Sequence, residues 1–176
     1  MDYFLEEPGV ESFALLGTDY VHPRTTNAIL EGYLIDAGID PDDIFINDTP
    51  FGHSDRATIV SDVVAMGAGG KQVGVISTIN GDANVGFYTE LAAPGIDSFD
   101  LPVVAFPVDE AELSGLDTSR LAGRMAARNY FMSADTPENE AFIADWHDFI
   151  GDDTRVTNDP MEVHYIGFNM WVNPVE

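Results

Sequence analysis

The chain has 176 residues, enough for a domain with a hydrophobic core, and its 45% hydrophobic and 22% charged residues are typical of a globular protein. It contains no cysteine, which excludes disulfides, thiolate catalysis and cysteine-ligated zinc. Asp and Glu total 31 against 7 Lys and Arg, and the resulting net charge of −24 disfavours nucleic acid as a partner.

The acidic residues are spread along the whole chain, without a run of five or six. One interpretation is an acidic tail or a cation-binding patch. The even spread favours the other, an adaptation to high salt, because salt screens self-repulsion. No apolar run reaches the roughly 18 residues of a membrane span. The chain starts with Met1 and the acidic Asp2, whereas a signal peptide starts with a basic segment followed by an apolar one, so no signal peptide is recognised. The sequence therefore predicts a cytosolic protein or one whose targeting segment lies outside this chain.

Five short apolar segments are predicted to be strands: residues 13–17, 44–47, 73–78, 102–106 and 123–131. Those beginning near 13, 73 and 102 are apolar on consecutive residues, as strands covered on both faces must be. Helical spacing of apolar side chains predicts helices between them: Ile29, Leu30, Tyr33, Leu34 and Ala37, then Val60, Val63 and Val64, then Asn84, Phe87, Tyr88 and Leu91. These helices are expected to end at glycines: Gly38, Gly67 and Gly95.

The C-terminal part is predicted to be helical. One helix has Thr136 as its N-cap and Pro137 at its first position. A second helix has Asp159 as its N-cap and Pro160 at its first position. Strand starts recur at intervals of roughly 30 residues, the size of a βαβ unit, which predicts an α/β fold with a parallel sheet. No linker or repeat is visible, so residues 1–176 are expected to form a single domain.

In an open α/β sheet, ligands bind at the carboxyl ends of the strands. That rule selects the loops 17–25, 78–84, 105–113 and 128–135. Their side chains form no recognisable catalytic group, and no pair of histidines has helical metal-site spacing, so no enzymatic activity, metal or cofactor is expected. Asp19, Asp82 and Asp109 are individually explained as turn residues or helix caps. As a set, the loops favour a binding face.

Several strings resemble the urea ABC-transporter substrate-binding proteins, in the branched-chain amino acid and amide group of type I periplasmic binding proteins. They run in order from about residue 11 to 170: LLGTDYVHPRTTN, FGHSD, STINGDANVGFYTEL, NYFMSADTPENEAFI and VTNDPMEVHYIG. Proteins of this group close a ligand between two α/β lobes, and this chain resembles the second lobe alone. The resemblance implies an open, mostly parallel five-stranded sheet of order 2-1-3-4-5 with helices on both faces. It also implies a periplasmic or extracellular location, with the first lobe, the export signal and the C-terminal hinge segment outside this chain.

The resemblance implies a ligand-binding set: Tyr20, Asn80, Asp82, Phe106 and Asp109. The family's corresponding tyrosine reaches the ligand from the second lobe, and the loops 80–82 and 106–109 face the cleft. Urea is small, planar and neutral, so its site needs acceptors for four N–H groups, a donor for the carbonyl and a flat apolar wall. Asp82, Asn80 and Tyr20 carry polar groups of these types, and Phe106 and Tyr20 carry flat aromatic rings.

The leading hypothesis is a binding lobe for urea or a short amide that serves ABC-transporter uptake through permease components. Amide sensors of the same fold carry a similar GTDY…PR stretch, so a cytoplasmic sensor regulating a partner protein is the alternative. An enzyme is disfavoured because no nucleophile–base pair is visible. Absence of the first lobe is expected to expose an apolar patch, favouring a homodimer or another partner.

Overall fold

The computed structural model describes residues 1–6, 9–93, 95–114 and 117–172, and it divides the chain into two compact units. Unit 1 comprises Met1–Pro107 and Leu116–Ala127, and unit 2 comprises Val108–Gly115 and Arg128–Glu176. The sequence predicts one domain over residues 1–176, because no linker or change of composition marks any of the three crossings between the units. The sheet belongs to unit 1, and each unit is described by itself.

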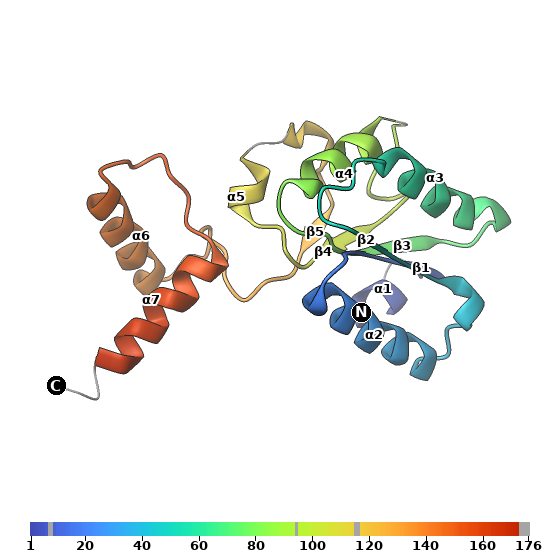
Figure 1. The fold of residues 1–176 in the computed structure, drawn as a ribbon, viewed down its shortest axis with the longest axis horizontal. Helices are drawn as coiled ribbons and strands as arrows, with labels where there is room; N and C mark the ends of the chain where they lie inside the picture. The colour runs from blue at the N-terminus through green and yellow to red at the C-terminus, as the bar shows by residue number, and fades with distance from the viewer. Residues whose placement is uncertain (7–8, 94, 115–116, 173–176) are drawn as a thin grey trace. The chain divides into compact units, whose positions relative to one another are not determined.

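Unit 1 is built on an open five-stranded sheet whose paired strands are all parallel, in the order β2-β1-β3-β4-β5 (Figure 1). The strands are β1 Ser12–Thr18, β2 Ile44–Thr49, β3 Val73–Thr78, β4 Val103–Ala105 and β5 Met125–Ala126. The central strands β1 and β3 are buried along their whole length, because helices cover both faces of the sheet. The predicted fold class and strand order are confirmed.

Helices α1 and α2 cover one face of this sheet, and α3 and α4 cover the other (Figure 1). The bounds are α1 Asp2–Glu6, α2 Val21–Asp36, α3 Arg56–Met66 and α4 Ala83–Ala92, with short 3-10 helices η1 Pro41–Asp43, η2 Gly67–Gly69 and η3 Thr118–Arg120. All four predicted apolar-face residues of α4 are buried. The stripe of α2 is narrower than predicted: Leu30 and Leu34 are buried, whereas Ile29 is 66% exposed. Helix α1 was not predicted.

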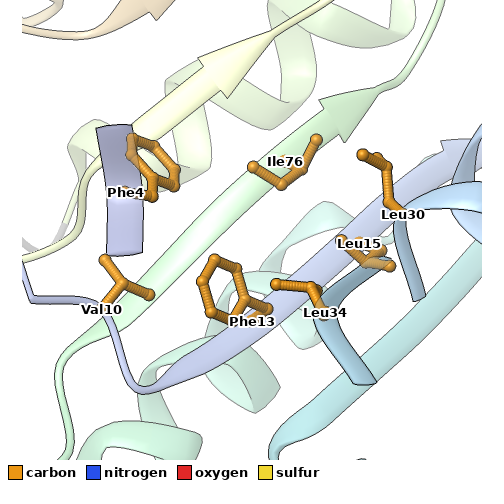
Figure 2. Close-up of a cluster of buried hydrophobic side chains, with 7 residues drawn as sticks. All are labelled: Phe4, Val10, Phe13, Leu15, Leu30, Leu34 and Ile76. Carbon is orange, nitrogen blue, oxygen red and sulfur yellow. The ribbon is translucent and has the colours of Figure 1, made fainter. Parts of the chain in front are cut away.

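The core on the α2 face joins the centre of the sheet to α1 and α2. Figure 2 shows its side chains: Phe4, Val10, Phe13, Leu15, Leu30, Leu34 and Ile76. Burial of one such side chain stabilises the fold by about 1.5–3 kcal/mol. Gly74 of β3 has no room for a side chain, because an added Cβ would lie 2.9 Å from a methyl group of Val10. This packing holds the N-terminal segment, with Phe4 and Val10, against β3.

The fifth strand is much shorter than predicted. Residues 123–131 read as a strand, but only Met125 and Ala126 pair with β4. The preceding Arg124 guanidinium donates to the carbonyl oxygens of Leu101 and Ile96, each at 3.0 Å. The aromatic end of the segment belongs to unit 2, where the buried Tyr130 packs. The predicted strand therefore combined a short edge strand of unit 1 with a segment that belongs to unit 2.

Unit 2 contains three helices in its described part, α5 Glu110–Leu113, α6 Pro137–Ile150 and α7 Asp159–Val172. The predicted N-cap of α6 is confirmed: the Thr136 hydroxyl accepts from the amide of Asn139 at 3.2 Å. At α7 the predicted cap, Asp159, is wrong by one residue. The Asn158 side chain accepts from the amide of Met161 at 3.1 Å, while the Asp159 carboxylate is engaged elsewhere in unit 2. No described helix is both long and apolar enough to cross a membrane.

Candidate functional site

A pocket of about 450 Å³ lies in unit 1, where β1, β2 and β3 end at the same edge of the sheet. This volume is within the range of small-molecule pockets. Its lining comes from the last residue of β1, from the loops after β2 and β3, and from the first residues of α3 and α4: Thr18, Pro50, Phe51, Gly52, His53, Arg56, Asn80, Gly81, Asp82 and Ala83. The pocket thus occupies the edge at which parallel α/β sheets bind ligands.

Hydrogen bonds between the strand ends hold the loops in register. The Thr49 hydroxyl of β2 donates to the Gly17 carbonyl of β1 at 3.3 Å. The amide of Asn80, just after β3, donates to the Thr18 hydroxyl at 3.0 Å. The Thr78 hydroxyl donates to the carbonyl of Leu16 at 3.1 Å. Because these groups are buried or half-buried, their bonds position the pocket wall and offset the cost of burying polar atoms.

The most deeply buried cation of the pocket is Arg56, the first residue of α3 and only 3% exposed. Its Nη1 donates to the Thr49 hydroxyl at 2.9 Å. Its stem lies against α4, since a Cβ added to Gly86 would be 3.5 Å from the Arg56 Cγ. Burial lowers the pKa of Arg56, but an arginine remains protonated at any physiological pH. The pocket therefore has a fixed positive charge in its wall.

The carboxylate next to this arginine does not neutralise it. Asp55 is the N-cap of α3, and its two oxygens accept from the Thr58 amide at 3.1 Å and the Thr58 hydroxyl at 2.9 Å. These hydrogen bonds lower the pKa of Asp55. Among the described residues, no carboxylate oxygen lies within ion-pair distance of the Arg56 guanidinium.

Asn80 and Asp82, both predicted as ligand-binding residues, line the pocket. The Asn80 side chain donates to the carbonyl of Thr78 at 2.8 Å, which orients the amide. Asp82 precedes α4 as its N-cap residue, but its exposed carboxylate makes no capping hydrogen bond. The two side chains therefore present oxygen acceptors at the mouth of the pocket.

Tyr20 lies beside the pocket, although it is not one of the lining residues. It is half-buried and extended at the start of α2, with φ −158°. Its ring centroid is 5.3 Å from that of Phe51, at an interplanar angle of 36°. Phe51 lines the pocket and is 69% exposed, so the two rings form a continuous aromatic surface at the pocket rim.

Phe106 lies on the other face of the sheet. It follows β4, and side chains alternate between the two faces of a strand, so it points the same way as Val104. Both pack against the core cluster on the α2 face. The α3 and α4 residues of the pocket come from the helices that cover the opposite face (Figure 1).

Asp109 belongs to unit 2, where it is 2% exposed. Its carboxylate accepts from the Ala111 amide at 2.9 Å, while the Glu112 carboxylate accepts from the Asp109 amide at 3.1 Å, a capping box at the start of α5. The Arg128 guanidinium lies 3.4 Å from its second oxygen. Burial, followed by the hydrogen bond with Asp109, raises the pKa of Glu112 to about 7. Neither Phe106 nor Asp109 lines the pocket of unit 1.

Sequence analysis missed Phe51, His53 and Arg56. All three belong to the loop after β2 or to the helix that follows it, and FGHSD was already part of the family resemblance. Applying the carboxyl-end rule to every predicted strand would have selected this loop. No signal in the sequence marked Arg56 as buried. Within the part of the chain that the structure describes, no group of three His, Asp or Glu side chains is placed to hold a metal ion.

Comparisons with known proteins agree with this architecture. A family model described as a periplasmic binding protein domain matches residues 1–176. The chain is also similar to a solved solute binding protein of an ABC transporter from Rhodopseudomonas palustris BisB5, in complex with 3,4-dihydroxybenzoic acid, at a TM-score of 0.67 and 16% identity. The match covers 84% of this chain and 39% of that one. At this identity the likeness shows the fold alone.

Proposed function

Because the chain belongs to the periplasmic binding protein domain family, we propose that it forms one wall of a solute-binding cleft for urea or a short-chain amide. The receptor containing it would deliver the solute to an ABC permease on the periplasmic or extracellular side of a membrane. The observation that carries the proposal is the pocket at the ends of β1, β2 and β3, which combines oxygen acceptors, a guanidinium donor and an aromatic rim.

The chemistry of an amide fits these groups. The carboxylate of Asp82 and the side-chain oxygen of Asn80 are acceptors for N–H groups, and Arg56 is a donor for a carbonyl oxygen. Phe51 and Tyr20 offer a flat apolar surface for a planar molecule. The solved neighbour, which binds a planar aromatic acid, is in keeping with a planar solute. No observation on the described residues favours the alternative of an amide sensor, so we do not propose it.

A single wall leaves the solute partly in water, and each hydrogen bond then contributes only about 0.5–1.5 kcal/mol. We expect this chain alone to bind urea or acetamide with a Kd no better than roughly 1 mM. Two-dimensional NMR titration of the labelled chain measures affinities in this range. The expected result is saturable shifts confined to the loops 50–56 and 80–83, and shifts spread evenly over the surface would contradict the proposal.

Asp82 provides the sharpest test of the site. Asp82→Ala removes an exposed acceptor from the pocket and is expected to weaken urea binding by roughly five- to tenfold, the loss of one charge-assisted hydrogen bond. Asp62→Ala is the matched control, because Asp62 is an exposed carboxylate of α3 outside the pocket and its loss changes the net charge equally. Equal affinities in the two variants would remove Asp82 from the site.

Tyr20 tests the aromatic rim. Tyr20→Ala removes the ring that packs on Phe51 and is expected to weaken binding more than Tyr20→Phe, which removes only the hydroxyl, worth about 1 kcal/mol. Tyr33→Ala serves as the control, because Tyr33 is a 42%-exposed tyrosine farther along α2. Unchanged urea affinity in Tyr20→Ala would exclude this ring from ligand binding.

A further inference from the structure

Arg56 is a buried cation whose guanidinium has neither an acidic partner nor a full set of hydrogen bonds among the described residues. Arg24 pairs with Asp19 and Lys71 pairs with Asp43. Arg128 lies between two carboxylates, and Arg124 donates to two backbone carbonyls. In a chain with 31 acidic residues and 7 Lys and Arg, an arginine that is 3% exposed and faces no carboxylate among the described residues is unusual.

Burial of a charge is costly unless it is paired or fully hydrogen-bonded. A guanidinium has five N–H donors, and within the described residues only the Nη1 of Arg56 has a hydrogen-bond partner, the Thr49 hydroxyl at 2.9 Å. That hydroxyl in turn donates to the Gly17 carbonyl. The bond therefore holds the guanidinium on a rigid strand end and leaves its other donors for something that enters the pocket.

The surroundings of Arg56 favour a negative group at this place. Helices α3 and α4 both begin in the pocket wall, at Arg56 and Ala83, and the positive end of a helix dipole favours anions. The Asp82 side chain does not cap α4. Asp55 is occupied by the capping bonds to Thr58. A solute anion would thus meet a preorganised cation whose acidic neighbour is already engaged.

We propose that Arg56 binds a carboxylate of the solute, so that the pocket takes a small amide or ureido compound carrying an acid group in preference to neutral urea. The planar fork of arginine matches a carboxylate, and such charge-assisted pairs are about twice as strong as neutral hydrogen bonds. Asp82 and Asn80 remain acceptors for the N–H groups of the same molecule. This inference rests on the proposed function, because it specifies which amides the site selects.

The matched probes are N-carbamoylglycine and N-carbamoylglycinamide, which share the ureido group and differ in the carboxylate. Urea and acetate are the probes that carry only one of the two groups. NMR titrations at constant ionic strength are expected to show the acid binding at least about tenfold more tightly than its neutral amide. The Arg56 Nε–H resonance of the unmodified chain is expected to shift with the acid, and at equal occupancy to shift less with urea, which offers only a neutral carbonyl oxygen.

Arg56→Gln keeps a donor for Thr49 and removes the charge. It is expected to abolish the preference for the acid over the neutral amide, a ratio measured within one variant. Arg24→Gln is the matched control, because Arg24 is an exposed cation with 63% of its side chain accessible and does not line the pocket. It is expected to keep the full preference. Should Arg56→Gln fail to fold, the Nε–H shift of the unmodified chain decides the question.

The outcomes separate this inference from the proposed function. If urea and the neutral amide bind as tightly as the acid, the carboxylate assignment fails and the amide function stands. A preference for the acid that survives in Arg56→Gln, or an Arg56 Nε–H that does not shift with the acid, also overturns the assignment. If acetate binds as tightly as the acid in an Arg56-dependent manner while urea does not bind, the carboxylate site stands and the amide function fails.

Discussion

Gly17 is the position at which the strand end beneath the pocket tolerates least change. A Cβ added to Gly17 would lie 2.8 Å from the Pro23 Cβ and 2.8 Å from the Thr78 hydroxyl, and it would also collide with the Asp48 carboxylate. Ordinary contacts between such atoms are about 3.5–4.0 Å. Asp48 accepts from the side chain of Asn27 at 2.9 Å, so its displacement would disturb a half-buried hydrogen bond as well.

We therefore expect Gly17→Ala to destabilise unit 1. Overpacking costs about 1–3 kcal/mol and the strained hydrogen bond about 1 kcal/mol, together about 2–4 kcal/mol of the free energy of unfolding. The corresponding fall in Tm is roughly 5–15 °C. Circular dichroism is the appropriate probe, because both tryptophans, Trp146 and Trp171, belong to unit 2 and do not report on unit 1.

Gly32→Ala is the internal control for this experiment. Gly32 lies within α2, and a Cβ added there would meet nothing within 4 Å. Alanine should stabilise the helix by about 0.5–1 kcal/mol through its lower backbone entropy in the unfolded chain. If Gly17→Ala proved as stable as Gly32→Ala, the tight packing of the β1 end would be refuted, and with it the rigid support for the pocket.

Three further predictions concern charge and association. The Tm is expected to rise in molar potassium chloride, because salt screens the repulsion of a −24 chain; an unchanged Tm would contradict a halophilic adaptation. The raised pKa of Glu112, about 7 against 4.5 ordinarily, means that the folded state binds its proton more tightly, so stability is lost as pH rises from about 4.5 to 7. Glu112→Gln should flatten that loss in tryptophan fluorescence melts of unit 2. Light scattering should reveal a dimer or larger species, because Phe149, Phe168 and Trp171 are 84%, 63% and 68% exposed; a strict monomer would count against association.

The sheet was predictable because its signals are local. Consecutive apolar residues mark β1 and β3, and the recurrence of strands at βαβ spacing indicates parallel pairing without any tertiary information. The division into two units was not predictable, because no sequence signal marks the three points at which the chain changes unit, residues 107–108, 115–116 and 127–128. Tyr130 illustrates the consequence. Its apolar neighbours read as part of a strand, whereas its hydroxyl bonds to Asn139 at 2.7 Å within unit 2.

The pocket was only partly predictable, and side-chain direction explains why. The carboxyl-end rule selected the loop 78–84, and the family resemblance named Asn80 and Asp82 within it, which line the pocket. The same rule selected Phe106, which points to the α2 face, because loop position says nothing about the face on which a side chain emerges. Asp109 was predicted as a ligand-binding residue, but it caps α5. The sequence alone does not distinguish a carboxylate that binds a ligand from one that caps a helix.

The strand order explains why the pocket forms where it does. From β1 the chain passes through α2 on one face to β2, and from β3 it passes through α4 on the other face to β4 (Figure 1). The loop leaving β1 therefore turns toward the face opposite to the loops leaving β2 and β3, and these last two loops line a crevice at the end of β1. The hydrogen bond from the Asn80 amide to the Thr18 hydroxyl ties the two strand ends together at the floor of this crevice. Arg56 is added to the pocket wall from the first position of α3, so the strand order accounts for the position of the pocket, while the proposed preference for an acid depends on this single side chain.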